Sequence, residues 1–224
     1  MTTAQTGYTL GQRYIGCGAE QGEITLTQVP GNALVAYLNG AKIELFCNAQ
    51  DATGDTMNAG EIVVHGSSGD ATGYAMRGGA IYIEQDAGYR CGIHMKEYQE
   101  KVPVIVIGGR CGSFLGEYQA GGIILVLGIG WEDRVPVGNF CGTGMHGGKI
   151  YLRTDHLPQD LPAQVVVSEG TEEDLRAIDP LLRRYCAHFG GGEEQTLLNS
   201  LRASHYYVLS PNTKNPYKQL YVNN

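Results

Sequence analysis

The sequence is poor in charge and has no long apolar run. Charged residues make up 17% of its 224 residues, and no uninterrupted apolar stretch approaches the roughly 18 to 20 residues that a membrane-spanning helix needs. The first twelve residues, MTTAQTGYTLGQ, lack the basic stretch and the apolar core of a secretory signal peptide. We therefore expect a cytoplasmic protein.

Further absences limit the possible ligands. The 16 Lys and Arg residues do not cluster and the net charge is −7, which argues against a surface for nucleic acid or an anionic membrane. The six cysteines form no CxxC pair, and the six histidines show no zinc-ligand spacing. The sequence therefore predicts no catalytic, cofactor-binding or metal-binding residue in this chain, and it favours Cys91, Cys111 and Cys141 as buried small hydrophobes.

Glycine, in contrast, is abundant: the 33 glycines are about twice the usual share of about 7%. The excess belongs to a repeat that is marked by seven isoleucines, Ile24, Ile43, Ile62, Ile81, Ile105, Ile124 and Ile150. A second aliphatic residue follows two positions later in every repeat: Leu26, Leu45, Val64, Ile83, Ile107, Val126 and Leu152. This period of two predicts one short strand per repeat, with one face pointing inward.

The repeat predicts a parallel β-helix. Between residues 22 and 152 there is no clear 3.6-residue apolar pattern of helix length, so crossover helices cannot connect the parallel strands. If each repeat makes one full turn, equivalent residues stack about 4.8 Å apart and the isoleucines form an inner column. We predict an all-β fold, a single-stranded right-handed parallel β-helix of about seven turns over residues 1–155. The positions between the two aliphatic columns, from Thr25 to Tyr151, are expected on an outward face that touches solvent or a neighbour.

Recurring glycines and methionines support the same coiling. Gly66, Gly69 and Gly73 recur as Gly109, Gly112 and Gly116, as expected if each turn bends at corners that need a positive φ or a missing Cβ. Four methionines lie three residues after a repeated glycine, which indicates a core ladder rather than a redox or copper site: Met57, Met76, Met95 and Met145.

Two repeats are longer than 19 residues. The extra residues lie around Glu97–Lys101 and around Trp131–Arg134. Insertions in a solenoid form loops on its side, and such loops are either neutral variation or contact surfaces. Trp131, the sole tryptophan, favours contact.

Residues 156–224 form a predicted appendage of a linker, two or three helices and an extended tail packed on the coils. Val165–Val167 suggests a short strand, and Thr171 with its acidic successors suggests a helix start. Asp179 followed by Pro180 predicts a second helix that ends at Gly190–Gly192, and a third helix is expected within residues 193–203. The tyrosine-rich tail from Ser204 is expected to dock on the helix wall or on a partner.

Several enzyme classes lack the residues they require. GIG at 128–130 precedes no helix, so a dinucleotide site fails its context test. Asp55, Asp70 and Asp86 occupy comparable corners, where a polysaccharide lyase would need stacked acids, but they fit equally well as turn residues. The 19-residue repeat also lacks the six-residue beat of hexapeptide acyltransferases. An autonomous β-helix enzyme or ligand-binding protein remains the alternative to a structural protein.

At the level of motifs, GDATGYAMRGGAIYI, FLGEYQAGGII and GTGMHGGKIYL resemble the C-terminal β-helix (GXGXG motif) domain of the glutamate synthase large subunit, in its stand-alone form. The resemblance covers nearly the whole chain, from GQRYIG to NPYKQLY. A weaker similarity, confined to the glycine coils, is to one of the subunits of formylmethanofuran dehydrogenase.

The resemblance implies a structural subunit of a multi-subunit glutamate synthase, in which glutamine hydrolysis is coupled to glutamate formation. It implies a glutamine amidotransferase subunit and a synthase subunit as partners, with the FMN and the iron–sulfur cluster on the partner rather than on this chain. A homo-oligomer is also possible under this hypothesis. The alternative is a scaffold subunit of a formylmethanofuran dehydrogenase-like complex.

Overall fold

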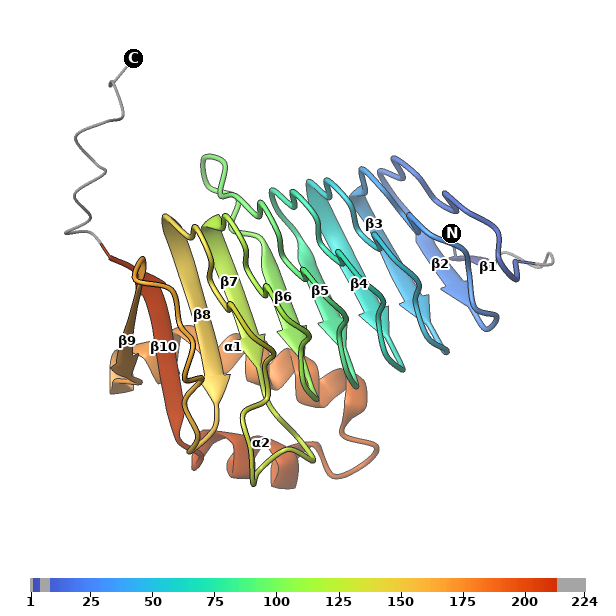
Figure 1. Ribbon diagram of the computed structural model, residues 1–224. Coiled ribbons are helices and arrows are strands. Elements are labelled where there is room, and N and C mark those ends of the chain that lie inside the picture. Colours follow the sequence, from blue (N-terminus) through green and yellow to red (C-terminus); the bar gives the residue numbers. More distant parts are fainter. Residues whose placement is uncertain (1, 5–8, 213–224) are drawn as a thin grey trace, which may run out of the picture.

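The computed structural model describes residues 2–4 and 9–212 of the chain. Its strands form one ten-stranded sheet in which β1 to β8 are parallel and follow chain order (Figure 1). The parallel strands are β1 (Thr2–Ala4), β2 (Glu23–Leu26), β3 (Asn39–Leu45), β4 (Ala59–Val64), β5 (Ala80–Ile83), β6 (Val104–Ile107), β7 (Ala120–Val126) and β8 (Gly147–Arg153). The predicted mainly-β fold is confirmed, and β1 is an additional strand that the repeat pattern did not indicate.

The predicted isoleucine column is confirmed. Each marker isoleucine pairs in register with the next, from Ile24 beside Ile43 to Ile124 beside Ile150. Six of the seven are 0% exposed, and Ile24, in the first repeat, is partly buried. The longer step between Ile81 and Ile105 does not shift this register. Burial of each such side chain stabilises the fold by about 1.5–3 kcal/mol, so the repeats stabilise one another across the stack.

A left-handed backbone also recurs in every repeat, at three alternating positions before the strand. In the fourth repeat these positions are Ala71, Gly73 and Ala75, with φ values of 54°, 68° and 50°. We number the repeats 1 to 7 and call the surface formed by these segments the αL wall: residues 13–18, 32–37, 51–56, 70–75, 89–94, 113–118 and 139–144. Most of the left-handed residues are not glycine, and each of those costs about 1–3 kcal/mol in backbone strain.

Hydrogen bonds between repeats hold the αL wall in this conformation. The N–H groups of the first and third left-handed residues donate to the following repeat: Ala71 to the Tyr89 carbonyl at 2.7 Å and Ala75 to the Ile93 carbonyl at 2.8 Å. The N–H group of the middle residue, Gly73, donates back to the preceding repeat. The wall is therefore a second ladder of backbone hydrogen bonds beside the sheet, which offsets the strain of the left-handed residues.

Gly73 shows why the middle position favours glycine. Besides its positive φ, a Cβ there would lie 2.5 Å from the Cδ1 atom of Ile105, so the middle position faces the isoleucine column across the core. Gly69 represents the other corner type: its φ is not left-handed, but a Cβ would lie 2.4 Å from the Asp51 Oδ1 atom. Both predicted reasons for corner glycines are thus confirmed. Repeat 2 departs from the pattern and has Val35 at the middle position, with φ 49°.

Two helices, α1 (Glu172–Phe189) and α2 (Glu194–Arg202), lie across the outward face of the sheet (Figure 1). They cover the positions between the aliphatic columns, where Tyr82, Val106, Leu125 and Tyr151 are at most 3% exposed. The helical residues packed against them include Ile178, Leu182, Tyr185, Leu198 and Leu201. The predicted outward face is therefore a second hydrophobic core in the later repeats.

The prediction of separate helices on either side of Asp179–Pro180 is wrong, because α1 runs through Pro180. Its buried stripe, Ile178, Leu182, Tyr185 and Cys186, continues across the proline, and packing of a continuous amphipathic face outweighs the hydrogen bond that proline removes. Asp179 therefore does not cap a helix. The start at Thr171 is confirmed by a capping box with Asp174, and the end at Gly190 is also confirmed.

The end of the sheet is closed by two strands from the appendage, β9 (Val165–Glu169) and β10 (Tyr206–Pro211). β10 inserts between β8 and β9 and is antiparallel to both. Leu209 lies opposite Ile150 and is 0% exposed, so β10 caps the isoleucine column. The short strand at Val165 and the docking of the tail are confirmed for these residues, and the tail beyond Asn212 lies outside the described residues.

Candidate functional site

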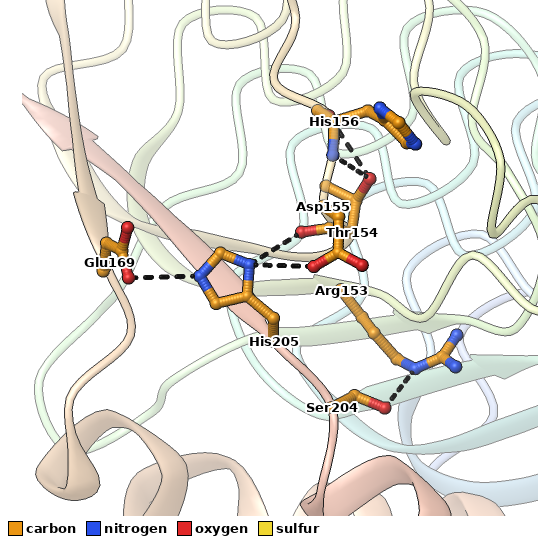
Figure 2. A network of polar contacts seen from close by, with 7 residues as sticks. All are labelled: Arg153, Thr154, Asp155, His156, Glu169, Ser204 and His205. Atoms are coloured by element: carbon orange, nitrogen blue, oxygen red, sulfur yellow. Dashed lines mark hydrogen bonds and ion pairs between the residues drawn. The ribbon is translucent and has the colours of Figure 1, made fainter.

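A polar network joins β8, β9 and β10 at the capped end of the sheet (Figure 2). The Nδ1 atom of His205 lies 3.2 Å from the Thr154 carbonyl oxygen and 3.3 Å from the Asp155 Oδ1 atom. Its Nε2 atom lies 3.2 Å from the Glu169 Oε2 atom. Both carboxylates are more than three-quarters exposed, so water screens them and the imidazole sits in a hydrated setting.

The hydroxyl of Ser204, the residue before His205, makes structural hydrogen bonds. Ser204 Oγ donates to the Ser200 carbonyl at 2.8 Å and accepts from Arg153 Nε at 2.8 Å. In Figure 2 the Ser204 side chain points toward Arg153 rather than toward the His205 ring. A nucleophile that a histidine base can activate must lie within hydrogen-bond reach of it, so this network lacks the arrangement of a serine hydrolase. Its contacts instead fasten β10 to β8.

The three singled-out cysteines are buried, as predicted, at 0–1% exposure. A hydrogen bond with Cys91 and burial raise the pKa of the Cys111 thiol well above its ordinary value. Burial raises the pKa of Cys141 to about 12. Because the thiolate is the form that attacks substrates and binds metals, Cys111 and Cys141 are unsuited to either role at neutral pH.

The methionine ladder is also buried, with all four side chains at most 2% exposed. In repeat 6 the equivalent position holds Gln119, which was not among the predicted ladder residues although it lies in register three residues after Gly116. Its Nε2 group donates to the Gly121 and Gly122 carbonyls at 3.2 and 3.1 Å. Its Oε1 atom is buried without a hydrogen-bond partner. The buried methionines, with Gln119 bonded to backbone carbonyls among them, fit the predicted core ladder.

The acidic corner residues serve the backbone. Asp70 Oδ1 accepts from the Tyr89 N–H at 2.8 Å, and Asp86 Oδ1 accepts from the Arg110 N–H at 2.8 Å. Asp55 Oδ1 accepts from its neighbour's hydroxyl, on Thr56. The Asp70 and Asp86 carboxylates thus tie one repeat to the next, whereas the Asp55 carboxylate makes a local contact, and all three fit turn residues.

A cleft of about 460 Å³ lies between the strand ends and α1, lined by residues that include Glu84, Asp86, Tyr185 and Phe189. The Tyr185 hydroxyl donates to the Glu84 carbonyl at 3.0 Å, and burial raises the pKa of this phenol. Asp86 is occupied by the backbone contact given above. The Tyr185 hydroxyl and the Asp86 carboxylate therefore both bond the protein itself.

The two inserted loops project from the stack. The Arg110 and Arg134 guanidinium groups both lie over the Trp131 ring, 4.7 and 4.0 Å from its centroid. In the other loop, Tyr98 is 57% exposed, and its backbone exchanges hydrogen bonds with Lys101. A role for these loops in partner contact stays a prediction.

The αL wall carries a concentration of exposed rings. Six of the thirteen exposed large hydrophobic side chains in the described residues lie on it: Tyr14, Tyr37, Tyr74, Tyr89, Tyr118 and Phe140. Rings stack from one repeat to the next, with His94 on Tyr118 at 5.1 Å between centroids. Exposed aromatic surface of this kind is typical of protein–protein contacts.

Within residues 2–4 and 9–212, no group of three or more His, Cys, Asp or Glu side chains is placed to hold a metal ion. Neither α1 nor α2 has the length and apolar composition that crossing a bilayer would require. In this part of the chain the arrangement provides hydrophobic cores, backbone ladders and exposed surfaces.

Comparisons with known proteins agree with this description. Residues 1–211 match the family described as GXGXG motif. Over 218 residues the chain is 43% identical to the uncharacterized protein MJ1350 of Methanocaldococcus jannaschii. The aligned region covers 95% of this chain and 83% of that protein. A chain of the formyltransferase/hydrolase complex FhcABCD from Methylorubrum extorquens, solved with methylofuran, superposes with a TM-score of 0.65 at 22% identity, covering 91% of this chain and 71% of that one. At this identity the structural likeness concerns the fold.

Proposed function

This chain belongs to the GXGXG motif family, and on that premise we propose that it is a structural subunit that holds together the catalytic chains of a multi-subunit enzyme complex. The proposal rests on one observation: the candidate polar side chains form hydrogen bonds that stabilise the fold. Asp70, Asp86, Ser204 and Tyr185 each bond backbone or clamp neighbouring strands. Exposed aromatic rings, in contrast, are left free on the αL wall and on the inserted loops.

We further infer that the seven repeats form a single-stranded, right-handed parallel β-helix. Consecutive strands are parallel and in register, and the αL wall adds a second set of bonds between the same repeats. Right-handed connection is the strongly preferred hand for consecutive parallel strands. Such a stack is stiff along its length and presents long sides to other proteins.

The solved relative points to one kind of complex. It is a chain of a formyltransferase/hydrolase complex, FhcABCD, solved with methylofuran, and it matches this fold over 91% of the present chain. We propose a complex of this general type, in which the present chain is the non-catalytic scaffold.

Glutamate synthase is the second candidate, and the glycine motifs such as GDATGYAMRGGAIYI favour it. In that setting the partners would be a glutamine amidotransferase and a synthase subunit, and the partners would carry the FMN and the iron–sulfur cluster. An autonomous enzyme or ligand binder has less support, because the Asp86 carboxylate and the Tyr185 hydroxyl at the cleft beside α1 already bond the protein itself.

Affinity capture of the tagged chain from its native host, followed by mass identification and subunit stoichiometry, tests the proposal. We expect catalytic subunits in fixed ratio to this chain, and their identity separates the two candidates. Formyltransferase and hydrolase chains favour the first, whereas amidotransferase and flavoprotein chains favour the second. Recovery of the chain without any stoichiometric enzyme subunit would contradict the scaffold function.

A further inference from the structure

We propose that the edge strand β9 pairs with β9 of a second copy of this chain, antiparallel and across a two-fold axis at Val167. This inference does not depend on which enzyme complex contains the chain. It rests on the direction of the backbone groups of β9, on the turns that limit its free edge and on the register that its side chains favour.

β9 is the outermost strand at the capped end of the sheet (Figure 1). It pairs with β10 on one side, where Val167 lies opposite Leu209. A strand in this position presents one row of backbone N–H and C=O groups to which another strand can bind. Natural edge strands often carry lysine or proline, which prevent such pairing. The sequence of β9, VVVSE, contains neither residue.

Two hydrogen bonds establish which residues point toward β10. The Asn212 N–H donates to the Gln164 carbonyl at 2.7 Å. At the other end of the pair, the Gly170 N–H donates to the Tyr206 carbonyl at 2.8 Å. Both bonds involve even-numbered residues on the β9 side, and bonding residues alternate along an antiparallel ladder. The N–H and C=O groups of the odd-numbered residues of β9 therefore point away from β10.

This outward row contains two free donors. The Val165 N–H is already engaged, because it donates to the Pro162 carbonyl at 2.9 Å. Among the described residues, nothing accepts a hydrogen bond from the N–H groups of Val167 and Glu169, and nothing donates to the carbonyls of these two residues or of Val165. The free edge is thus a short row of groups that a second antiparallel strand can satisfy.

Both ends of the free edge are closed by the chain itself. The turn at Pro162 precedes Val165, and Gly170 and the N-cap Thr171 lead directly into α1. A partner strand much longer than β9 would meet the turn or the helix, so the edge favours a strand of the same length. β9 of a second copy has this length and offers the same free groups.

A two-fold axis perpendicular to the sheet at Val167 matches each free donor with a free acceptor. The Val167 N–H donates to the carbonyl of the partner subunit's Val167, and symmetry supplies the reciprocal bond. The Glu169 N–H donates to the carbonyl of the partner subunit's Val165, and this bond is also repeated by symmetry. Four backbone hydrogen bonds then join the two sheets into one.

The side chains favour this register. Val166, which is 42% exposed, lies opposite the partner subunit's Ser168. Glu169 lies opposite the partner subunit's Val165, and its carboxylate stays with His205 of its own chain. An axis at Ser168 would instead bring the two copies of Glu169 closer together, and like charges that face each other across a strand pair are destabilising.

Sedimentation equilibrium of the purified chain between about 1 and 200 µM tests the association. We expect a species of twice the 24.1 kDa chain mass. Val167→Pro removes the central donor, which points away from β10, so β9 can stay paired in its own sheet; dimerisation is expected to weaken at least tenfold. Val167→Thr keeps both the N–H group and a β-branched side chain, and is expected to leave dimerisation unchanged. A monomer throughout this range, a species larger than a dimer, or equal association of the two variants would overturn the proposal.

Cysteine pairs test the register without changing the β9 backbone, in a background with Cys17 and Cys47 replaced by Ser. Val166→Cys chains mixed with Ser168→Cys chains are expected to form an interchain disulfide with oxidised glutathione, because directly opposite residues lie about 4.5–5.5 Å apart. Each variant alone is the matched control, since its two copies are diagonal neighbours about 7–8 Å apart. Stronger disulfide formation by either variant alone would contradict the register, and no disulfide in the mixture would contradict the contact.

Discussion

Gly73→Ala isolates the physical reason for the glycine repeat. Gly73 combines a left-handed backbone, with φ 68°, and a position where a new Cβ would lie 2.5 Å from Ile105 Cδ1. Gly18→Ala is the matched control, because Gly18 has a φ of 69° but no heavy atom within 4 Å of a new Cβ. The two substitutions therefore share the backbone strain, and only the first adds a steric clash.

The magnitudes follow from these contacts. Left-handed strain costs about 1–2 kcal/mol for a residue with a Cβ, which is the loss expected for Gly18→Ala. The clash in a packed core adds about 1–3 kcal/mol, so Gly73→Ala should cost about 2–5 kcal/mol. Ile105→Val alone should cost about 0.5–1.5 kcal/mol. It also removes the Cδ1 atom that a Cβ at position 73 would meet.

The combined variant, Gly73→Ala with Ile105→Val, decides the question. We expect it to be more stable than the sum of the single losses by about 1–3 kcal/mol, because the second substitution removes the clash that the first creates. Urea unfolding followed by circular dichroism gives the four free energies of unfolding. If the two losses add within about 0.5 kcal/mol, the packing of the middle wall position against the isoleucine column is refuted.

Three further predictions concern the core, the helices and pH. Ile124→Asp should unfold the middle of the stack, because it places a charge in a 0% exposed column; normal thermal stability would contradict the inward assignment. Thr171→Ala should cost about 1 kcal/mol by removing the α1 capping box, measured as a lower urea midpoint, and no change would show that the cap is unimportant. Burial alone would raise the pKa of Glu61, but the His188 imidazole, with its Nε2 atom 3.5 Å from Glu61 Oε1, and the hydrogen-bonded Arg184 guanidinium lower it from 4.5 to about 2. The stability that this lowered pKa contributes is present above about pH 4.5 and is lost as the pH falls toward 2. Glu61→Gln should therefore flatten the pH dependence of the urea midpoint in this range. An unchanged pH dependence would exclude Glu61 as its source.

The strand register could be predicted from the sequence because a side-chain period of two admits only one set of inward residues. Ile105 and Ile124 were thus placed correctly despite a step of irregular length earlier in the chain. The left-handed positions at Ala71 and Ala75 could not be predicted, because alanine carries no signal for a positive φ. Their conformation is imposed by hydrogen bonds to neighbouring repeats, which are contacts distant in sequence.

The appendage was predicted less well for a related reason. Asp179 and Pro180 form a local signal for a helix start, but the apolar stripe of α1 packs on Tyr82 and Val106, far away in the chain. That burial overrides the local signal. The insertion of β10 between β8 and β9 likewise depends on the free edge of β8, which exists only once the repeats have stacked. For the candidate site, the sequence predicted only that catalytic, cofactor and metal motifs are lacking. The exposed aromatic rings of the αL wall could not be predicted, because they are brought together by left-handed positions that carry no sequence signal.

The most direct test of the scaffold function is the native mass and activity of the enzyme complex from host cells that lack this chain, with cells that carry it as the reference. We expect the complex to fall apart into smaller species, to lose the activity of the assembled enzyme, and to regain both when the purified chain is added back. A complex of otherwise unchanged composition and full activity in the absence of the chain would contradict the account.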